Sequence, residues 1–379
     1  MNILLMLLGV LVVYGVLQYI YKKNWTKGLS VKVGFQTDHA VPGDTIYLQE
    51  VVVNNKRLPL PYIYAKFQLS KNFKFLEEDG NSRISDQTYR NDVFSLLFYQ
   101  KVTRRIPLVC MKRGVYEIKN MEVVFAGLFM DETMVQSVPL SSQIVVYPEA
   151  VSTQRLEVPF RHMVGNMERK KYLLQDRFVF RGIRDYESYD SMKDINWKAS
   201  ARTGSLMVNE FNETVSQKVC ILLNLEPEGM LKQDRLSEES ISIAAGMAQM
   251  LIERGIEVSL LSNGCDIFNH EVIRIENGSG NLHLNTINTA LATIDLSQDS
   301  PDFSDMLHAQ QERDYLSRET EHIYVMISAN KRANLVEAIS AIVKDPAESL
   351  WIVPYHVGMN YELIGCEIPS VPWEVGYDK

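Results

Sequence analysis

The sequence has few cysteines and none of the short motifs that mark common catalytic or metal centres. No H-E-x-x-H, G-x-x-x-x-G-K-[ST], G-x-G-x-x-G or G-x-S-x-G occurs, and the seven histidines are scattered. The cysteines lie far apart without a C-x-x-C pair, which excludes a zinc signature and suits a reducing compartment or core packing. They are Cys110, Cys220, Cys265 and Cys366. The chain is therefore predicted not to be an enzyme.

The chain also lacks a surplus of positive charge. Its 39 Lys and Arg residues against 47 Asp and Glu residues give a net charge of −8. This balance argues against a nucleic-acid partner. The 379 residues, of which 46% are hydrophobic and 23% charged, are enough for two or three globular domains.

Only one apolar run is long enough to cross a membrane. No charged side chain occurs from Met1 to Tyr21, and Lys22, Lys23 and Lys27 follow. At ~1.5 Å per residue, the run from Ile3 to Tyr21 covers roughly the 30 Å of a bilayer's hydrocarbon core. The basic start and small-residue cleavage site of a signal peptide are missing. Residues 1–27 are therefore predicted to be an uncleaved, single-pass anchor in the lipid of the cell membrane, and the lysines predict that the soluble domains are cytoplasmic.

Residues 28–149 alternate between apolar and polar positions. In one such stretch Ile63, Ala65, Phe67 and Leu69 share a face. Short strands with this period and turns between them predict an all-β, immunoglobulin-like sandwich. Cys110 lies at the end of one strand, where we expect a small buried side chain rather than a nucleophile.

Residues 217–379 follow a different pattern. The apolar run Val219–Leu225 is typical of a strand buried on both faces. Helical periodicity follows it, and further strands are expected at His322–Ser328 and Ser349–Pro354. This alternation predicts a mainly parallel, doubly wound α/β domain.

Between these domains, residues 150–216 read as a linker followed by a dense charged cluster. The basic run that contains Arg169, Lys170 and Lys171 is interpreted as solvated linker, with anionic lipid as the alternative. The stretch from Arg184 to Arg202 holds four basic residues, four acidic residues and a tryptophan.

This cluster has two readings. Asp190 and Asp194 could pair as acid and base, but basic neighbours lower carboxyl pKa values and disfavour that role. We therefore expect an Arg–Asp clamp with a guanidinium stacked on Trp197. Such a clamp either locks the two domains together or presents a surface to a partner, with Trp197 as a hot spot.

The same stretch resembles the signature of the DUF 58 family, a domain of unknown function. The matching residues are Arg184, Tyr186, Asp190, Lys193, Ile195, Trp197, Ser200, Ala201 and Arg202, and Tyr189 replaces the usual glycine. The resemblance implies that the α/β domain is von Willebrand factor A-like. It also implies a membrane-anchored partner of a MoxR-type AAA+ ATPase, without an established activity of its own.

A von Willebrand A domain usually binds Mg²⁺ through an Asp-x-Ser-x-Ser loop after its first strand. Here the corresponding positions are Asn224, Glu226 and Glu228, and a later strand ends in Ser328 and Asn330. Mg²⁺ demands a strict set of oxygen ligands. The missing Asp and the longer glutamates therefore predict no metal and no cofactor.

The sequence thus predicts a membrane-anchored protein-interaction adaptor or scaffold that works with a MoxR-type AAA+ ATPase. A metal-dependent binding protein that uses Glu226 and Glu228 is the alternative. An unrecognised hydrolase centred on Asp190 and Asp194 has the least support.

Overall fold

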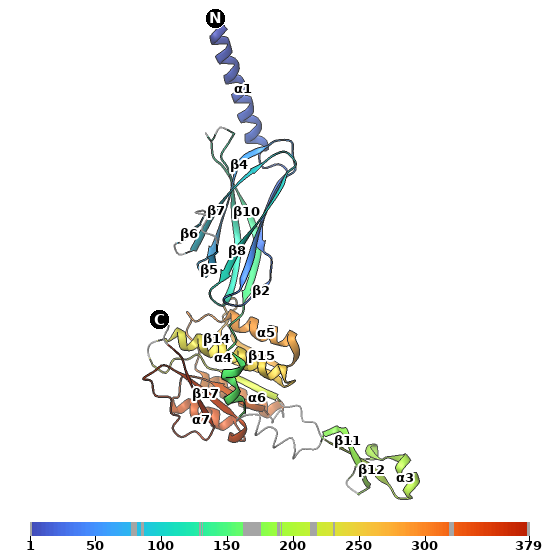
Figure 1. The fold of residues 1–379 in the computed structure, drawn as a ribbon. Helices are drawn as coiled ribbons and strands as arrows, with labels where there is room; N and C mark the ends of the chain where they lie inside the picture. Colours follow the sequence, from blue (N-terminus) through green and yellow to red (C-terminus); the bar gives the residue numbers. More distant parts are fainter. Residues whose placement is uncertain are drawn as a thin grey trace. The chain divides into compact units, whose positions relative to one another are not determined.

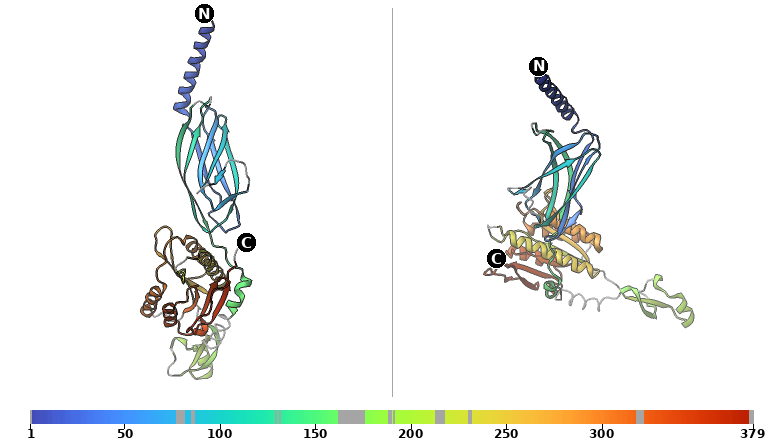
Figure 2. Two further views of the ribbon diagram at one scale, coloured as in Figure 1. Left: turned by 90° about the vertical axis from the view of Figure 1, so that its left-hand side faces the viewer. Right: turned by 45° about the horizontal axis from the view of Figure 1, so that its top comes forward.

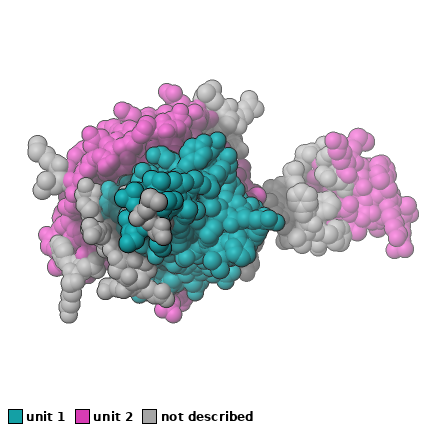
Figure 3. All heavy atoms as spheres, turned by 90° about the horizontal axis from the view of Figure 1, so that it is seen from above, with its two compact units in different colours: residues 1–149 teal, residues 150–379 magenta. Residues whose placement is uncertain are grey.

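The computed structural model describes residues 2–76, 82–84, 87–128, 130, 132–161, 176–187, 190, 192–212, 218–229, 232–317 and 322–376. Ribbon views are drawn in Figure 1 and Figure 2. The chain divides into two compact units, Met1–Glu149 and Ala150–Lys379, coloured teal and magenta in Figure 3.

The first unit begins with the apolar helix α1 (Asn2–Asn24). Within its segment Ile3–Asn24, an 18-residue window has a mean hydropathy of 2.4, so α1 is long and apolar enough to cross a membrane. The C-terminal end of α1 is different, because Tyr21 on its last turn and Trp25 directly after it are buried in the core of the following domain. Their rings stack on Phe125 at centroid distances of 5.6 and 5.9 Å.

Two sheets follow α1. The four-stranded sheet has the order β1 (Leu29–Phe35), β3 (Thr45–Asn54), β8 (Lys101–Cys110) and β5 (Phe73–Phe75). The six-stranded sheet has the order β2 (His39–Ala40), β10 (Met134–Val146), β9 (Gly114–Phe125), β4 (Leu60–Ser70), β7 (Gln87–Leu96) and β6 (Ser82–Ile84). Pairing is antiparallel except between β2 and β10.

Both sheets contribute to one apolar core, so the predicted β-sandwich is confirmed at this level (Figure 1). The alternation read from the sequence holds in β4, where Ile63, Ala65, Phe67 and Leu69 are buried and the side chains between them are not. Cys110 is also buried, and burial together with Asp44 raises the pKa of its thiol to about 11. This environment confirms the expected core packing.

The second unit is built on a six-stranded sheet. Its order is β15 (Val272–Gly278), β14 (Glu257–Cys265), β13 (Lys218–Leu223), β16 (His322–Ile327), β17 (Leu350–Tyr355) and β18 (Ser370–Glu374). Only the edge strand β15 pairs antiparallel, so the mainly parallel arrangement is confirmed.

Helices cover both faces of this sheet (Figure 2). One apolar cluster joins it to α4 (Asp234–Glu253) and α5 (Gly280–Thr293). The other joins it to α6 (Phe303–Ser317) and α7 (Ala333–Ile342), and the short η2 (Pro346–Glu348) precedes β17. The sheet is therefore doubly wound.

The segment 150–161 differs from the expected linker. A helix at 153–161 buries Leu156 and Phe160 in the α/β core. The helix α4 carries Gly246 at the contact, where a Cβ atom would lie 2.8 Å from the carbonyl oxygen of Val151. Apolar anchors and a glycine on the facing helix thus make this segment part of the α/β domain. Arg169, Lys170 and Lys171 lie outside the described residues.

Residues 176–212 form a small element that we call the signature lobe. Its strands β11 (Asp176–Asp185) and β12 (Met207–Asn212) pair antiparallel, and η1 (Met192–Asp194) and α3 (Trp197–Thr203) lie between them in the chain. Residues 188, 189 and 191 of the lobe, including Tyr189, are outside the described residues.

Candidate functional site

The predicted Arg–Asp clamp is present inside the signature lobe. Two nitrogens of the Arg184 guanidinium donate to the two carboxylate oxygens of Asp190, at 2.7 and 2.6 Å. The backbone N–H of Glu187 donates to the same carboxylate at 2.9 Å. These donors, Arg184 first, hold the pKa of Asp190 below its ordinary value. Asp190 therefore stays ionised at neutral pH, which does not suit a general acid.

Other signature residues fix α3 against β12. The side-chain oxygen of Asn196 accepts from the N–H of Ala199 and caps α3. The Ser200 hydroxyl donates to the Asn196 carbonyl and accepts from the N–H of Met207, both at 2.8 Å. Ile195 is buried and bridges to β12.

The connection between the strands is held in the same way. The backbone N–H of Tyr186 donates to the Leu206 carbonyl at 2.8 Å. Most of the signature is thus used to hold the shape of the lobe itself.

Trp197 is not part of this framework. It is 65% exposed, although it opens α3 in the middle of the signature. Among the described residues no guanidinium lies over its ring, so the expected stacking is wrong. Arg184 instead forms its hydrogen bonds with Asp190, and α3, on which Trp197 lies, has no buried residue. Arg202 is also exposed, and the side chain of Asp194 lies outside the described residues.

The second candidate site is the carboxyl edge of the α/β sheet, where β13 and β16 end. Asn224 is buried there, and its amide donates to the Ser328 hydroxyl at 3.1 Å. Its side-chain oxygen accepts from Asn263 at 2.8 Å and from the N–H of Glu226 at 2.9 Å. The Ser328 hydroxyl in turn donates to the Asn330 carbonyl at 2.9 Å. A neutral amide network therefore occupies the Asn224–Glu228 loop, for which the sequence predicts no metal.

The two glutamates of this loop pair with cations of the chain itself. Arg332 Nη1 lies 2.7 Å from Glu226 Oε1, and Lys331 Nζ lies 2.7 Å from Glu228 Oε2. Arg332 also donates to the carbonyl oxygen of Glu228 at 3.0 Å. Burial and the charge of Asp302 raise the pKa of Glu226 in spite of Arg332. Within the described residues, no group of three or more His, Cys, Asp or Glu side chains could hold a metal.

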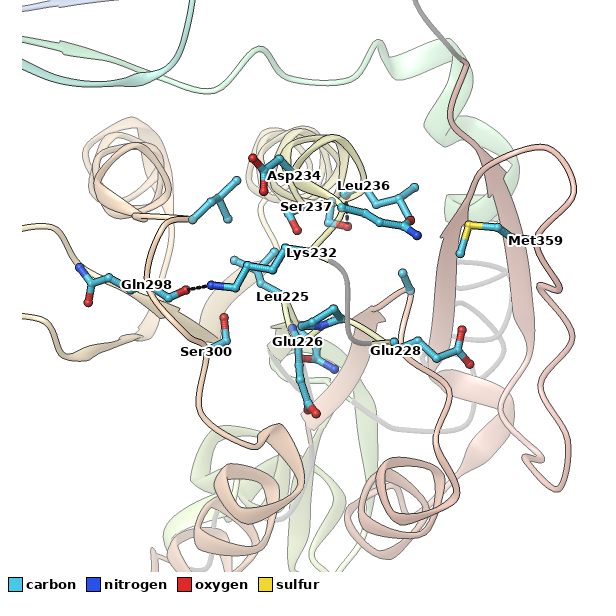
Figure 4. A pocket seen from close by; sticks show the side chains of 17 residues that line it. Leu225, Glu226, Glu228, Lys232, Asp234, Leu236, Ser237, Gln298, Ser300 and Met359 are labelled. Atoms are coloured by element: carbon cyan, nitrogen blue, oxygen red, sulfur yellow. Dashed lines mark hydrogen bonds between the residues drawn. The ribbon is translucent and has the colours of Figure 1, made fainter. Parts of the chain in front are cut away.

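A cavity of about 320 Å³ lies at this edge. Its apolar wall includes Leu225, Leu236 and Met359 (Figure 4). At one side Lys232 donates to the carbonyl oxygen of Gln298 at 2.7 Å, drawn as a dashed line in Figure 4. From β13 the chain runs outward through β14 and β15 on one side of the sheet and then continues with β16 on the other side of β13. Open α/β sheets usually bind ligands at such a point, where the strand order reverses.

Sequence reasoning missed a buried charged cluster inside the β-sandwich. Glu50 on β3 and Arg104 on β8 face Arg90 and Asp92 on β7, and Glu50, Arg90 and Asp92 are fully buried. Arg90 pairs with Asp92, and Arg104 lies 2.7 Å from the same carboxylate. The sequence does contain a signal for this cluster. Glu50, Arg90 and Asp92 occupy inward-facing positions in strands whose residues alternate between buried and more exposed.

Glu50 carries a proton in this cluster. Burial, followed by the charge of Asp92, raises the pKa of Glu50 to about 8. As a carboxylate it has no hydrogen-bond partner among the described residues, whereas the protonated form can donate to Asp92. The unfolded chain releases this proton above about pH 4.3 and the folded domain only near its own raised pKa. The stability that Glu50 contributes is therefore full below about pH 4 and is lost as pH rises towards 8.

Comparison with known proteins gives one family. The model of the protein of unknown function DUF58 matches residues 182–344. The match supports the assignment of this region of the chain to the DUF58 family. It spans most of the signature lobe and the α/β sheet as far as α7. The comparison with curated proteins gives no match.

Three solved structures show distant likenesses. A CARDB domain from Pyrococcus furiosus is 11% identical with a TM-score of 0.20, covering 31% of this chain and 94% of that chain. A non-cellulosomal cohesin from Archaeoglobus fulgidus is 10% identical with a TM-score of 0.21, covering 34% and 96%. Two domains of the pilin SpaD from Corynebacterium diphtheriae are 7% identical with a TM-score of 0.23, covering 31% and 51%. At these scores the likenesses carry no argument about function.

Proposed function

We propose that this protein is a membrane-anchored interaction adaptor or scaffold that binds a MoxR-type AAA+ ATPase through the signature lobe. The proposal rests on the observation that the signature residues have two different structural roles. Arg184, Asp190, Ile195 and Ser200 hold the lobe together, and Trp197 is left exposed on that frame. A tryptophan presented on a rigid element is a frequent hot spot of protein interfaces.

The membrane anchor is the second part of the proposal. Tyr21 on α1 and Trp25 directly after it belong to the sandwich core, so removal of α1 as a signal peptide would take the Tyr21 side chain from a folded domain and cut the chain next to Trp25. This packing favours an uncleaved anchor. Lys22, Lys23 and Lys27 favour a cytoplasmic position of both units.

The third part concerns the α/β domain, which we infer to be von Willebrand A-like and independent of metal. The Asn224 network and the two ion pairs place amides and the chain's own cations where that family usually binds Mg²⁺. Metal-dependent binding through Glu226 and Glu228 would require both pairs to open. We therefore favour contact with a protein over a metal-dependent mode.

The test is a pull-down by the full chain in lipid nanodiscs, with a purified MoxR-type ATPase of the same organism. Trp197→Ala is compared with Phe268→Ala, a matched control because Phe268 is also 65% exposed but lies outside the lobe. We expect retention by wild type and by the control, also after EDTA treatment, and loss in the Trp197 variant. Equal retention by both variants would exclude the lobe as the docking surface, and loss with EDTA would favour a metal-dependent mode.

A further inference from the structure

The loop between β7 and β8, which connects the two sheets of the sandwich, carries an unusual run of exposed apolar side chains. Leu97, Phe98 and Tyr99 are 60%, 62% and 63% exposed. Three consecutive large apolar residues at a water-exposed loop tip oppose solubility and are expected only where they serve a contact. Isolated exposed apolar residues would need no such explanation.

The backbone holds this loop in a fixed shape. Tyr99 has a φ of +51°, a left-handed conformation that Gly or Asn adopts with less strain. The side-chain oxygen of Gln100 accepts from the N–H of Leu97 at 2.8 Å. Asn54 donates to the Leu97 carbonyl, also at 2.8 Å. A large aromatic residue is thus kept where a small polar one would fit with less strain.

Hydrogen bonds connect this loop to the base of α1. The N–H of Tyr99 donates to the backbone carbonyl of Lys56 at 3.2 Å. The Lys56 ammonium donates to the carbonyl oxygens of Trp25 and, at 2.7 Å, of Lys27, just beyond the end of α1. The apolar tip therefore lies at the end of the sandwich where α1 ends (Figure 1).

Positive charge gathers at the same end. The side chains of Lys22, Lys23 and Lys27 are exposed at the base of α1, Arg57 follows Lys56, and Lys101 follows the loop. Aromatic and aliphatic side chains beside basic ones are the composition that proteins use at the bilayer interface.

We propose that the Leu97–Tyr99 loop is a second membrane contact, inserted into the interfacial layer of the leaflet from which α1 emerges. The occupant is the lipid bilayer, because the loop lies at the end of the sandwich that adjoins α1 and the basic residues around it match phospholipid headgroups. The inference rests on α1 spanning the membrane. Two contacts, a helix and a loop, fix the orientation of the sandwich at the bilayer, whereas a helix alone would leave it free to rotate.

The test uses spin labels on the full chain in nanodiscs of phosphatidylcholine and phosphatidylglycerol. Single cysteines replace Phe98, Met111 or Val10 in a Cys366→Ser background, since the remaining native cysteines are buried. Met111 is the matched control. It is an exposed apolar residue that follows the other end of β8, about 30 Å along the strand. Val10 reports on α1 separately.

Collision with oxygen, which partitions into lipid, is compared with collision with a water-soluble nickel complex. We expect oxygen to dominate at Phe98 and Val10, and nickel to dominate at Met111. If oxygen collisions dominate at Val10 but nickel collisions dominate at Phe98, the loop contact is overturned and the anchor stays in place. If both reagents collide rarely with the label at Phe98, the loop is buried against protein, such as a second copy of the chain, and the lipid contact is overturned. If nickel collisions dominate at Val10, the anchor itself is overturned.

Discussion

Replacing Trp25 with alanine should destabilise the sandwich, although this residue directly follows a helix that reads as purely membrane-spanning. Trp25 is 5% exposed and stacks on Phe125, which is fully buried. Removing a large aromatic side chain from such a core costs about 3–5 kcal/mol. For a unit of this size, ~1 kcal/mol lowers the melting temperature by about 2–4 °C. The expected loss is therefore roughly 6–20 °C.

The assay is thermal unfolding of the full chain in detergent, followed by hydrogen exchange of peptides from β4 and β9. Tyr19→Ala is the matched control, because Tyr19 is an aromatic residue near the end of α1, six positions before Trp25, and is 64% exposed. Its change should be small. If Trp25→Ala shifts unfolding no more than Tyr19→Ala, the end of α1 is not part of the sandwich core.

Three further predictions follow from the buried and paired charges. Glu50→Gln should stabilise the sandwich near pH 8 and flatten the fall in stability between about pH 4 and 8 that wild type shows in chemical denaturation; an unchanged pH profile would contradict a protonated Glu50. Asp190→Asn should speed amide exchange across residues 184–212 while the α/β core melts as before, and exchange equal to wild type would show that the Arg184 pair does not hold the lobe. Calorimetry should detect no Mg²⁺ binding by wild type, and EDTA should leave its melting temperature unchanged; a Mg²⁺-dependent rise would contradict the pairing of Glu226 with Arg332 as the resting state.

The elements with strong local patterns could be predicted from the sequence. The alternation in β4 and the continuous apolar run of β13 depend on neighbours within one segment, and both strands are present. The charged run around Arg184 also predicted a clamp, since its members lie only six residues apart.

Features built from distant segments could not be predicted in this way. Glu226 meets Arg332 across more than one hundred residues, and no local pattern pairs them. Trp25 was grouped with the membrane segment, because its partner Phe125 lies one hundred residues away, at the end of β9. The stacking expected on Trp197 failed for a related reason, since composition does not say which of two partners an arginine selects.

The most direct test of the proposed function is the affinity of the full chain in nanodiscs for the MoxR-type ATPase, measured for wild type, Trp197→Ala and Phe268→Ala. A hot-spot tryptophan contributes about 2 kcal/mol or more, so we expect at least a roughly 30-fold rise in Kd for Trp197→Ala. The Phe268 control should bind as wild type does. Wild-type affinity in a folded Trp197→Ala variant would contradict docking through the signature lobe.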